Sequence, residues 1–421
     1  FSTSTSHACQ PSPSTWTTAR IRDLVIRKFG KRPCLWQIKV AQALKEKQQD
    51  VVAVAATGSG KTLSFWIALL MDLEDGQDKV VIVVTPLNLL GKQNEAVLHA
   101  AGIEAVAVDA ENATKETFDV TGKYRVIVFG PEIIMMEGGY CEKLWQKQSF
   151  TSKIAYMVFD EGHCIIEWSS FREQYKHLGA LRHLLAGKTP PFYIPSATLP
   201  SAVLSEVTAT MRLRKDATAY ILRSNDRPEV SLVVRQMKYA ANSYKDLDFL
   251  IPDDFLEDDV APPKFLVFFD STKEAEAAAT YLTSRLPSGL RGKIKHFHAT
   301  MTSWYRADEY EALKDGKTYG LCVTDSFGMG LDLSDIELII QWKVPQTMNT
   351  LWQRFGRAAR GGCPGAFAIL IAEKDAFDDV RQRKTVTTGK PSRKRKRSSK
   401  GRDVRSKRTS GVAGPGARPD R

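Results

Sequence analysis

A glycine-rich segment between an apolar run and a helical stretch constrains this chain more than any other feature. The apolar run Val51–Ala55 leads into the segment, and the apolar helical stretch Leu63–Leu73 follows it. Its residues are Thr57, Gly58, Ser59, Gly60, Lys61 and Thr62. The backbone N–H groups of such a turn cradle phosphates, the lysine meets the β and γ charges, and the threonine hydroxyl ligates magnesium. The segment therefore predicts a P-loop that binds a nucleoside triphosphate with Mg²⁺.

Short apolar runs alternate with helical patterns twice along the chain. Before a break at 225–228 the runs are Val51–Ala55, Val80–Val84, Val126–Phe129, Ile154–Phe159 and Phe192–Ile194; after it they are Phe265–Phe269, Ile294–Phe297, Leu321–Val323, Leu338–Ile340 and Ala366–Ile371. Helical stretches near 273–285, 303–314 and 349–357 separate the later runs. Buried runs that alternate with helices indicate parallel sheets. The predicted fold class is therefore α/β, with two tandem doubly wound domains.

The two ends of the chain differ in composition from the part between them. We expect a disordered segment at 1–20, a first domain at 21–222, a second domain at 223–375 and a disordered basic tail at 376–421. Residues 381–421 carry 16 basic and 2 acidic residues, whereas the whole chain has a net charge of +12. The folded part is thus near neutral, and any basic groove in it must be local. The dense basic run at 390–400 predicts a nuclear-import signal or a nucleic-acid tether, and hence the nucleus; a merely solvated tail is the alternative.

Composition excludes two other classes of protein. No uninterrupted apolar run reaches the length of about 18 residues that would span a bilayer. The six cysteines are scattered without a C-x-x-C pair, so we expect neither a disulfide framework nor a structural zinc site. Nor do we assign a metal to the lone histidines His99, His177 and His298.

Two neighbouring carboxylates end the apolar run Ile154–Phe159. A P-loop requires a second acidic contact for its metal, and Asp160 is placed to hold magnesium. Glu161 is expected to orient or deprotonate the water that attacks the γ-phosphate. The pair predicts the catalytic half of a nucleotide hydrolase.

Two arginines three residues apart lie in the second half of the chain. Arg357 and Arg360 stand near the end of the helical stretch 349–357, and positions i and i+3 share one face of a helix. Both side chains are therefore expected to point at one anion. Arginine stabilises a transferring phosphoryl group, so we expect both to serve catalysis, with Arg360 as the preferred arginine finger.

Together these blocks resemble the superfamily-two helicases. The matching motifs are motif I at 55–62, motif II at 160–163, motif III at 196–198, motif V at 323–332 and motif VI at 353–362. The continuation Asp160-Glu-Gly-His-Cys-Ile165, followed by Trp168, Phe171, Arg172 and Tyr175, resembles motif II and the aromatic-rich loop of RecQ-family DNA helicases. Asn225-Asp-Arg-Pro228 is similar to the start of the second RecA-like domain in that family.

The resemblance implies ATP and Mg²⁺ as cofactors and movement in the 3′ to 5′ direction on single-stranded or forked DNA, in DNA repair and recombination. It implies that Gln37 contacts the adenine and Asp332 the ribose. Gln353 would bridge the nucleotide and the domain interface, and Thr62 and Asp160 would hold magnesium. His163, Ser196 and Thr198 would couple hydrolysis to DNA movement. Trp168, Phe171, Arg172 and Thr324 would contact the DNA strand, because aromatic faces stack on bases and arginine pairs with phosphate.

The sequence also departs from the RecQ pattern. Gly162 replaces the usual alanine, and both the stretch from Phe29 to Gln37 and the aromatic-rich loop are one residue short. No cysteine follows Cys363, so we expect the helicase core without a zinc-binding and winged-helix region.

Two other functions remain open. An RNA helicase of the DEAD-box kind is favoured by Ser196-Ala-Thr198 and opposed by the His163-Cys164 continuation. A nucleic-acid clamp that hydrolyses little ATP is opposed by Lys61 and Asp160. Stimulation of ATP hydrolysis by DNA, by RNA or by neither separates the three.

Overall fold

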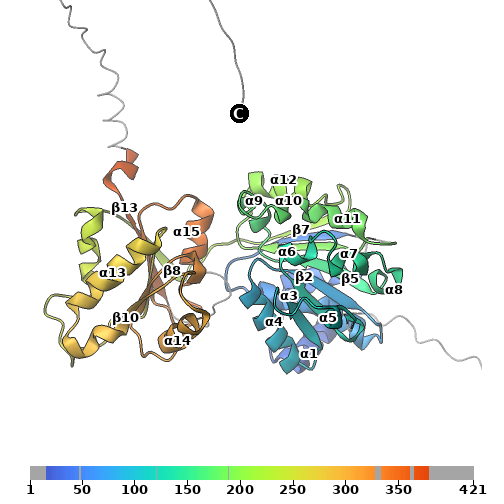
Figure 1. Cartoon of the computed structure of the whole chain (residues 1–421), viewed down its shortest axis with the longest axis horizontal. Helices are drawn as coiled ribbons and strands as arrows, with labels where there is room; N and C mark the ends of the chain where they lie inside the picture. The colour runs from blue at the N-terminus through green and yellow to red at the C-terminus, as the bar shows by residue number, and fades with distance from the viewer. Residues whose placement is uncertain are drawn as a thin grey trace, which may run out of the picture. The chain divides into compact units, whose positions relative to one another are not determined.

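The computed structural model describes residues 16–46, 49–119, 121–187, 189–327, 333–360 and 365–378. The elements discussed below lie in one compact unit that ends at Lys374. Among the described residues, no helix is both long and apolar enough to cross a membrane. The predicted parallel α/β architecture is confirmed: within the described ranges the strands lie in two sheets (Figure 1), and the strand pairs are parallel.

The first sheet has seven strands in the order β3-β4-β2-β5-β6-β1-β7. Their bounds are Asp50–Val54 (β1), Val80–Val84 (β2), Ala105–Val108 (β3), Val126–Phe129 (β4), Ile154–Phe159 (β5), Phe192–Ser196 (β6) and Thr218–Leu222 (β7). The strands β5, β6 and β1 are neighbours, so the loops after their carboxyl ends meet at one edge. This places the P-loop, the Asp160–Glu161 pair and Ser196 side by side.

Helices cover both faces of the first sheet. Alternate strand residues point into two separate apolar cores, with Val81 and Val83 in one and Ile82 and Val84 in the other. The helices on the first face are Thr18–Phe29 (α1), Leu35–Glu46 (α2) and Lys61–Glu74 (α3), joined by Asn88–Ala100 (α4). The remaining helices of this half are Lys115–Asp119 (α5), Pro131–Ile134 (α6), Tyr140–Trp145 (α7), Gln148–Thr151 (α8), Cys164–Glu167 (α9), Gln174–His177 (α10), Leu181–Leu184 (α11) and Ser201–Thr210 (α12).

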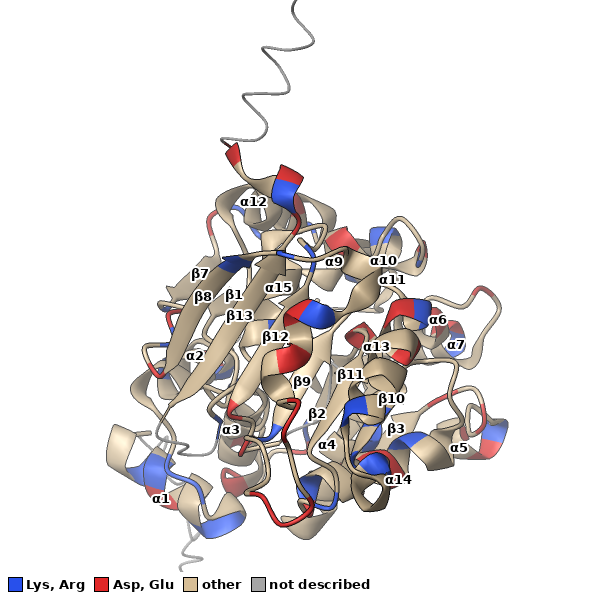
Figure 2. Ribbon diagram, turned by 90° about the vertical axis from the view of Figure 1, so that its left-hand side faces the viewer, with Lys and Arg blue, Asp and Glu red and all other residues tan. Residues whose placement is uncertain are grey.

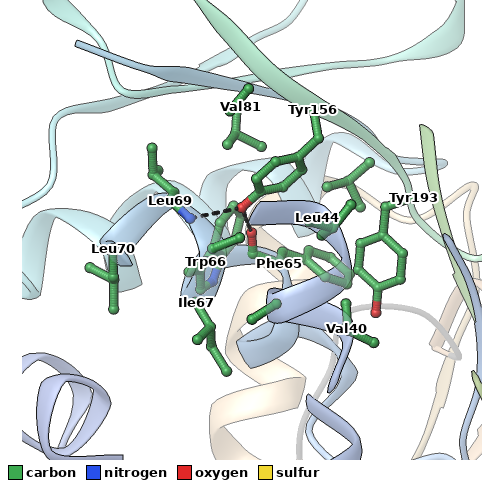
Figure 3. Close-up of a cluster of buried hydrophobic side chains, with 14 of the residues drawn as sticks. Val40, Leu44, Phe65, Trp66, Ile67, Leu69, Leu70, Val81, Tyr156 and Tyr193 are labelled. Atoms are coloured by element: carbon green, nitrogen blue, oxygen red, sulfur yellow. Dashed lines mark hydrogen bonds between the residues drawn. The ribbon is translucent and has the colours of Figure 1, made fainter. Parts of the chain in front are cut away.

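Two tyrosine hydroxyls tie helix α3 to the sheet, and Figure 3 shows the bonds of the first, Tyr156. On β5, the Tyr156 hydroxyl accepts from the Leu69 amide at 3.2 Å and donates to the Phe65 carbonyl. On β6, the Tyr193 hydroxyl lies 2.6 Å from Ser64 Oγ. All of these side chains are buried. The start of α3, which carries Lys61, is thereby held in register with the strands that lead to Asp160 and Ser196.

The second sheet has six strands in the order β10-β11-β9-β12-β13-β8. Their bounds are Val230–Gln236 (β8), Phe265–Phe268 (β9), Ile294–Phe297 (β10), Gly320–Val323 (β11), Leu338–Trp342 (β12) and Ala366–Ala372 (β13), and the helices are Thr272–Arg285 (α13), Ser303–Lys314 (α14) and Met348–Phe355 (α15). The central strands β9, β11 and β12 carry no charged residue (Figure 2). Such apolar strands are typical of a parallel sheet that is buried on both faces.

The structure corrects two expectations about the elements. Strands β3, β7 and β8 were not predicted. The chain is helical from Thr18 within the segment expected to be disordered, because Thr17 caps α1 by accepting from the Arg20 amide at 3.2 Å. Residues 1–15 and the basic tail at 379–421 lie outside the described residues, so their predicted disorder stays a prediction.

Candidate nucleotide and nucleic-acid site

The P-loop adopts the backbone that its glycines permit. Gly58 and Gly60 have φ values of 81° and 78°, in the left-handed region that other residues rarely adopt. Gly60 is the N-cap of α3, so the helix begins at Lys61 with its free backbone N–H groups at the loop. Thr62 is exposed in the first turn. This arrangement suits a phosphate chain.

The Lys61 ammonium folds back onto the loop. Its Nζ donates to the carbonyls of Ala55 and Ala56 at 3.2 and 3.3 Å. Burial lowers the pKa of Lys61, although the nearby carboxylates Glu161 and Asp160 oppose that shift. A phosphate group would give this partly desolvated cation a full counter-charge.

Gln37 lies behind the P-loop. Its Nε2 donates to the Gly60 carbonyl at 2.7 Å, and its Oε1 accepts from the Cys34 amide at 2.7 Å. The side chain is only 2% exposed, and a Cβ on Gly60 would lie 3.0 Å from Nε2. Gln37 therefore fixes the loop that binds phosphate, and its contact with adenine stays a prediction.

The two acidic residues follow β5 with a strained backbone between them. Glu161 has a φ of 50°, and its amide donates to Asp160 Oδ1 at 2.9 Å. Burial and the adjacent Glu161 raise the pKa of Asp160. Burial also works to raise the pKa of Glu161, but the neighbouring His163, Lys61 and the two arginines of motif VI outweigh it and lower that pKa. Glu161 is therefore an ionised carboxylate, as a base or water-orienting group requires.

Magnesium fits the donors that are present. The Thr62 hydroxyl and the Asp160 carboxylate are hard oxygen ligands, which this ion prefers. Glu161 Oε2 is buried and accepts no hydrogen bond within the described part of the chain. A metal-bound water beside it would satisfy that oxygen.

The departure at Gly162 has a steric reason. A Cβ at this position would overlap the side chain of Ile194 on β6. The Gly162 amide also donates to the Pro195 carbonyl at 2.9 Å, which holds the backbone close to that strand. Glycine is therefore the residue that this local packing accommodates.

A hydrogen-bond network joins motifs II, III and VI. His163 Nδ1 lies 3.0 Å from Ser196 Oγ, and the Thr198 amide donates to the same oxygen at 3.2 Å. From α15, Gln353 Nε2 donates to His163 Nε2 at 2.7 Å and to Thr198 Oγ1 at 3.1 Å. Burial lowers the pKa of His163, so the ring is neutral and Nε2 accepts. The three residues predicted to couple hydrolysis to movement thus form one connected group with Gln353, which was predicted to bridge the nucleotide and the domain interface.

The predicted helical arrangement of the two arginines is wrong. Helix α15 ends at Phe355, so Arg357 and Arg360 lie in the turn beyond it and do not share a helical face. Gly356 closes the helix, and Ala359 has a φ of 48°, which a continued helix does not allow.

The turn nevertheless brings both arginines to the P-loop. Arg360 Cγ lies 3.8 Å from the position of a Cβ on Gly58, and Arg360 Nε donates to the Gly356 carbonyl at 3.2 Å. A Cβ on Gly356 would lie 2.8 Å from Thr57 Oγ1. Both arginines act electrostatically on Lys61 and Glu161. The structure thus gathers Lys61 and Glu161 with the two arginines.

Arg354, one turn earlier, has a different environment. It is 3% exposed and donates to Asp325 at 2.8 Å, to Asp270 at 2.7 Å and to Gln341 at 2.6 Å. These bonds attach α15 to the carboxyl ends of the sheet strands. Arg354 is structural, in contrast to the two arginines that follow.

The aromatic-rich loop follows α9. Phe171 is 68% exposed, whereas the Trp168 ring is half-buried, with its centroid 5.6 Å from that of Phe171. Arg172 pairs with Glu132 at 2.6 and 2.7 Å and donates to the Pro86 carbonyl at 2.5 Å. Phe171 is therefore the side chain best exposed to stack on a base. The guanidinium of Arg172 is engaged within the protein, and its contact with DNA stays a prediction.

The two remaining predicted residues follow β11. Thr324 Oγ1 lies 3.2 Å from Ser326 Oγ, and its amide donates to the Phe297 carbonyl at 3.3 Å. Asp332 lies outside the described residues, as does all of motif V after Phe327. Their contacts with DNA and ribose stay predictions.

Some residues of the site were not identified from the sequence. Arg227 marked only the start of the second half, yet its guanidinium bonds to backbone carbonyls of the P-loop and of motif VI. Asn349 donates to Glu167 at 2.6 Å, a second bond between α15 and the region of motif II. Bonds to backbone carbonyls leave no pattern of residue types, so the position of Arg227 before Pro228 was the only available signal.

Comparisons with known proteins agree with this geometry. The DEAD/DEAH box helicase model matches residues 35–207, and the helicase conserved C-terminal domain model matches residues 249–362. The chain is 27% identical over 349 residues to ATP-dependent helicase wrn-1 of Caenorhabditis elegans, with 79% of this chain and 31% of the relative covered.

Two bacterial relatives are similar at the same level. Identity is 28% over 333 residues to the probable ATP-dependent DNA helicase RecS of Bacillus subtilis, covering 78% of this chain and 62% of the relative. Identity to the ATP-dependent DNA helicase RecQ of Haemophilus influenzae is 26% over 339 residues, which covers 77% of this chain and 49% of the relative. The chain thus spans less than two thirds of the length of each of these relatives.

Solved structures share the fold. The DUF1998 helicase MrfA bound to DNA gives a TM-score of 0.70 at 16% identity, covering 90% of this chain and 54% of that one. A DEAD-box helicase bound to ssRNA and UDP-BeF gives a TM-score of 0.70 at 20% identity, covering 88% of this chain and 78% of that one. At these identities the likeness shows two RecA-like domains and nothing about the nucleic acid.

Proposed function

The chain belongs to the RecQ family of ATP-dependent helicases, and from that premise we propose that it is a DNA motor. In this proposal, ATP binds between the two RecA-like domains and closes them on single-stranded DNA, and hydrolysis reopens them. The chain moves 3′ to 5′. The bond between Gln353 and His163 carries the proposal, because it connects the nucleotide site to motif VI directly.

On the nucleotide side, each residue has a role that follows from its position. The P-loop amides and Lys61 bind the phosphates, and Thr62 and Asp160 would hold magnesium, which supplies Lewis-acid stabilisation of the γ-phosphate when bound. The ionised Glu161 orients the attacking water and takes its proton. Arg360, over Gly58, stabilises the charge of the transferring phosphoryl group, with Arg357 beside it.

In this proposal, the network of His163, Ser196, Thr198 and Gln353 couples ATP hydrolysis to movement along the DNA. A ligand shifts a conformational equilibrium only by its different affinity for the two states. ATP contacts residues of both domains only when they are closed, so the closed state binds it more tightly. The loss of the γ-phosphate removes that difference, and the domains reopen.

We propose that the nucleic acid along which the chain moves is DNA and not RNA. The relatives RecS and RecQ are named as DNA helicases. The exposed Phe171 beside Trp168 provides a stacking surface that tolerates any base. Binding through stacking and phosphate contacts is sequence-tolerant and weakens with salt.

The test is steady-state ATP hydrolysis by the full chain with single-stranded DNA, with single-stranded RNA and with neither. The proposal expects DNA to raise turnover more than RNA does, and Lys61→Ala to abolish it. Greater stimulation by RNA would favour the RNA-helicase function, and ATP binding without turnover would favour a clamp.

We also propose that the chain acts in the nucleus. The support is the basic run at 390–400, whose dense Lys and Arg composition matches an import signal. A fluorescent fusion of the full chain should concentrate in nuclei, and replacement of five lysines and arginines of the run by serine should disperse it. Equal distribution of both fusions would contradict this.

A further inference from the structure

Arg227 occupies a buried position in the segment that joins the two sheets. It lies between β7, which ends at Leu222, and β8, which begins at Val230. Its side chain is 8% exposed. Its amide donates to Asp226 Oδ1 at 2.9 Å, and its carbonyl accepts from the Val230 amide at 2.9 Å. The backbone thus directs the guanidinium inward at the start of the second domain.

The guanidinium donates to four backbone carbonyls. Nη1 bonds to Thr57 O at 3.2 Å and Gly356 O at 3.1 Å, and Nη2 bonds to Ala358 O at 2.8 Å and Ala359 O at 3.1 Å. Nε pairs with the Glu229 carboxylate. A planar fork with five fixed donors satisfies several acceptors at once, and a lysine ammonium in the same place has only three.

Three of these carbonyls belong to the turn that carries the two arginines. The turn leaves the helix at Gly356, and Ala359 takes the left-handed conformation immediately before Arg360. Carbonyls 356, 358 and 359 converge on one point, which concentrates negative partial charge and would open the turn if no donor stood there. The guanidinium of Arg227 supplies that donor.

The fourth carbonyl belongs to the P-loop. Thr57 O shares Nη1 with Gly356 O, and Gly356 itself packs against the Thr57 side chain. One group therefore sets both the shape of the motif VI turn and its distance from the phosphate-binding loop. Arg360 is the residue in that turn that lies over Gly58.

We propose that Arg227 is a positioning residue for the arginine finger: it holds the turn 356–360 so that Arg360 meets the γ-phosphate. This inference rests on the proposed ATPase function. Among the described residues, Arg227 bonds to the machinery through backbone carbonyls, so its loss should slow hydrolysis and leave ATP affinity almost unchanged. Misplacement of a catalytic group by about 1 Å costs on the order of 10²-fold in rate.

The experiment compares full-length variants in DNA-stimulated ATP hydrolysis, in binding of a fluorescent non-hydrolysable ATP analogue and in thermal unfolding. Arg227→Lys keeps the charge and loses the fork. Arg223→Ala is the matched control, because this exposed arginine lies in the same segment. Arg227→Lys should lower kcat by about 10²-fold with analogue affinity within about twofold, and Arg223→Ala should change neither.

A double mutant separates positioning from a general loss of structure. If Arg227 acts through the finger, Arg227→Lys in an Arg360→Ala background should slow turnover no further. Multiplicative effects, an unchanged kcat, or a loss of analogue affinity equal to the loss of kcat would each overturn the proposal.

Two further arms keep the result interpretable. If Arg227→Lys fails to fold, Glu229→Gln provides the test, because it keeps the Arg227 guanidinium and removes the carboxylate with which it pairs. A lower kcat at constant analogue affinity would support the proposal, and an unchanged kcat would contradict it. Wild-type chain that binds the analogue without hydrolysing ATP would end the proposed function and this role with it. If the wild-type chain hydrolyses ATP and Arg227→Lys is equally fast, the positioning role of Arg227 is contradicted and the proposed function stands.

Discussion

The side-chain amide of Gln353 donates a 2.7 Å hydrogen bond to Nε2 of His163. Burial lowers the pKa of His163, and because Nε2 of the neutral ring accepts from Gln353, the ring proton is on Nδ1, which lies 3.0 Å from Ser196 Oγ. The ring therefore transmits a displacement of α15 to the serine that ends β6 and to the residues beside the catalytic carboxylates. A rotation of either domain must break or rebuild this contact.

The first prediction concerns that bond. Gln353→Ala should lower DNA-stimulated turnover by about 10-fold or more while unstimulated turnover changes less, because the mutation leaves a buried imidazole acceptor without its donor. Steady-state hydrolysis over a range of DNA concentrations measures both rates.

Asn349→Ala is the control for Gln353→Ala. It removes another bond between α15 and the motif II region, the one to Glu167, and leaves the bond from Gln353 to His163 in place. Its effect on stimulation should be smaller. Equal losses from the two variants would show that the contact area, and not the histidine, couples the sites.

A second prediction distinguishes the three arginines of motif VI. Arg360→Ala should lower kcat by about 10³-fold with the melting temperature unchanged, because its charge acts in the transition state. Arg357→Ala should cost less. Arg354→Ala should instead destabilise the chain by about 2 kcal/mol or more, since it leaves Gln341 and two carboxylates without their partner. Thermal unfolding and kcat, measured together, check the ranking; a folded Arg360→Ala with wild-type kcat would contradict it.

The third prediction concerns the track. Phe171→Ala should weaken single-stranded DNA binding by about 1–3 kcal/mol and leave the melting temperature unchanged, because the ring is 68% exposed. Arg172→Ala should lower the melting temperature, because it breaks the pair with Glu132. Fluorescence anisotropy with labelled oligonucleotide measures the first effect. Unchanged DNA affinity in Phe171→Ala would remove this ring from the binding surface.

A fourth prediction concerns the registration of the P-loop helix. Tyr156→Phe should cost about 1–3 kcal/mol of stability, because it deprives the buried Leu69 amide and Phe65 carbonyl of the hydroxyl. Tyr193→Phe should cost less, since Ser64 Oγ also donates to the Lys61 carbonyl at 2.5 Å. Urea unfolding of both variants gives the comparison, and a larger loss in Tyr193→Phe would contradict it.

Sequence reasoning succeeded where residue type and spacing carry the chemistry. Lys61, Asp160 and Glu161 follow apolar runs that are buried on both faces, and such runs can be recognised from the sequence alone. Strands β7 and β8 were missed although β7 contains the apolar residues Ala219–Leu222; both are sheet edges on which half-buried and exposed side chains are mixed.

Errors about the site had a related cause. Arg357 and Arg360 were assigned to a helical face because they lie three residues apart near the end of the helical stretch 349–357, but the turn that replaces the helix depends on the left-handed Ala359 and on carbonyl bonds to Arg227. The pairing of Arg172 with Glu132 joins residues 40 positions apart and needs the fold to bring them together.

Directional movement along DNA tests the central claim most directly. Full-length chain would be mixed with ATP and single-stranded oligonucleotides that carry streptavidin on a biotin at either the 5′ or the 3′ end. A 3′ to 5′ motor displaces streptavidin from the 5′ end faster than from the 3′ end, and Glu161→Gln, which retains ATP binding, should displace neither. Displacement from the 3′ end in preference, or none from either end despite DNA-stimulated hydrolysis, would contradict the account.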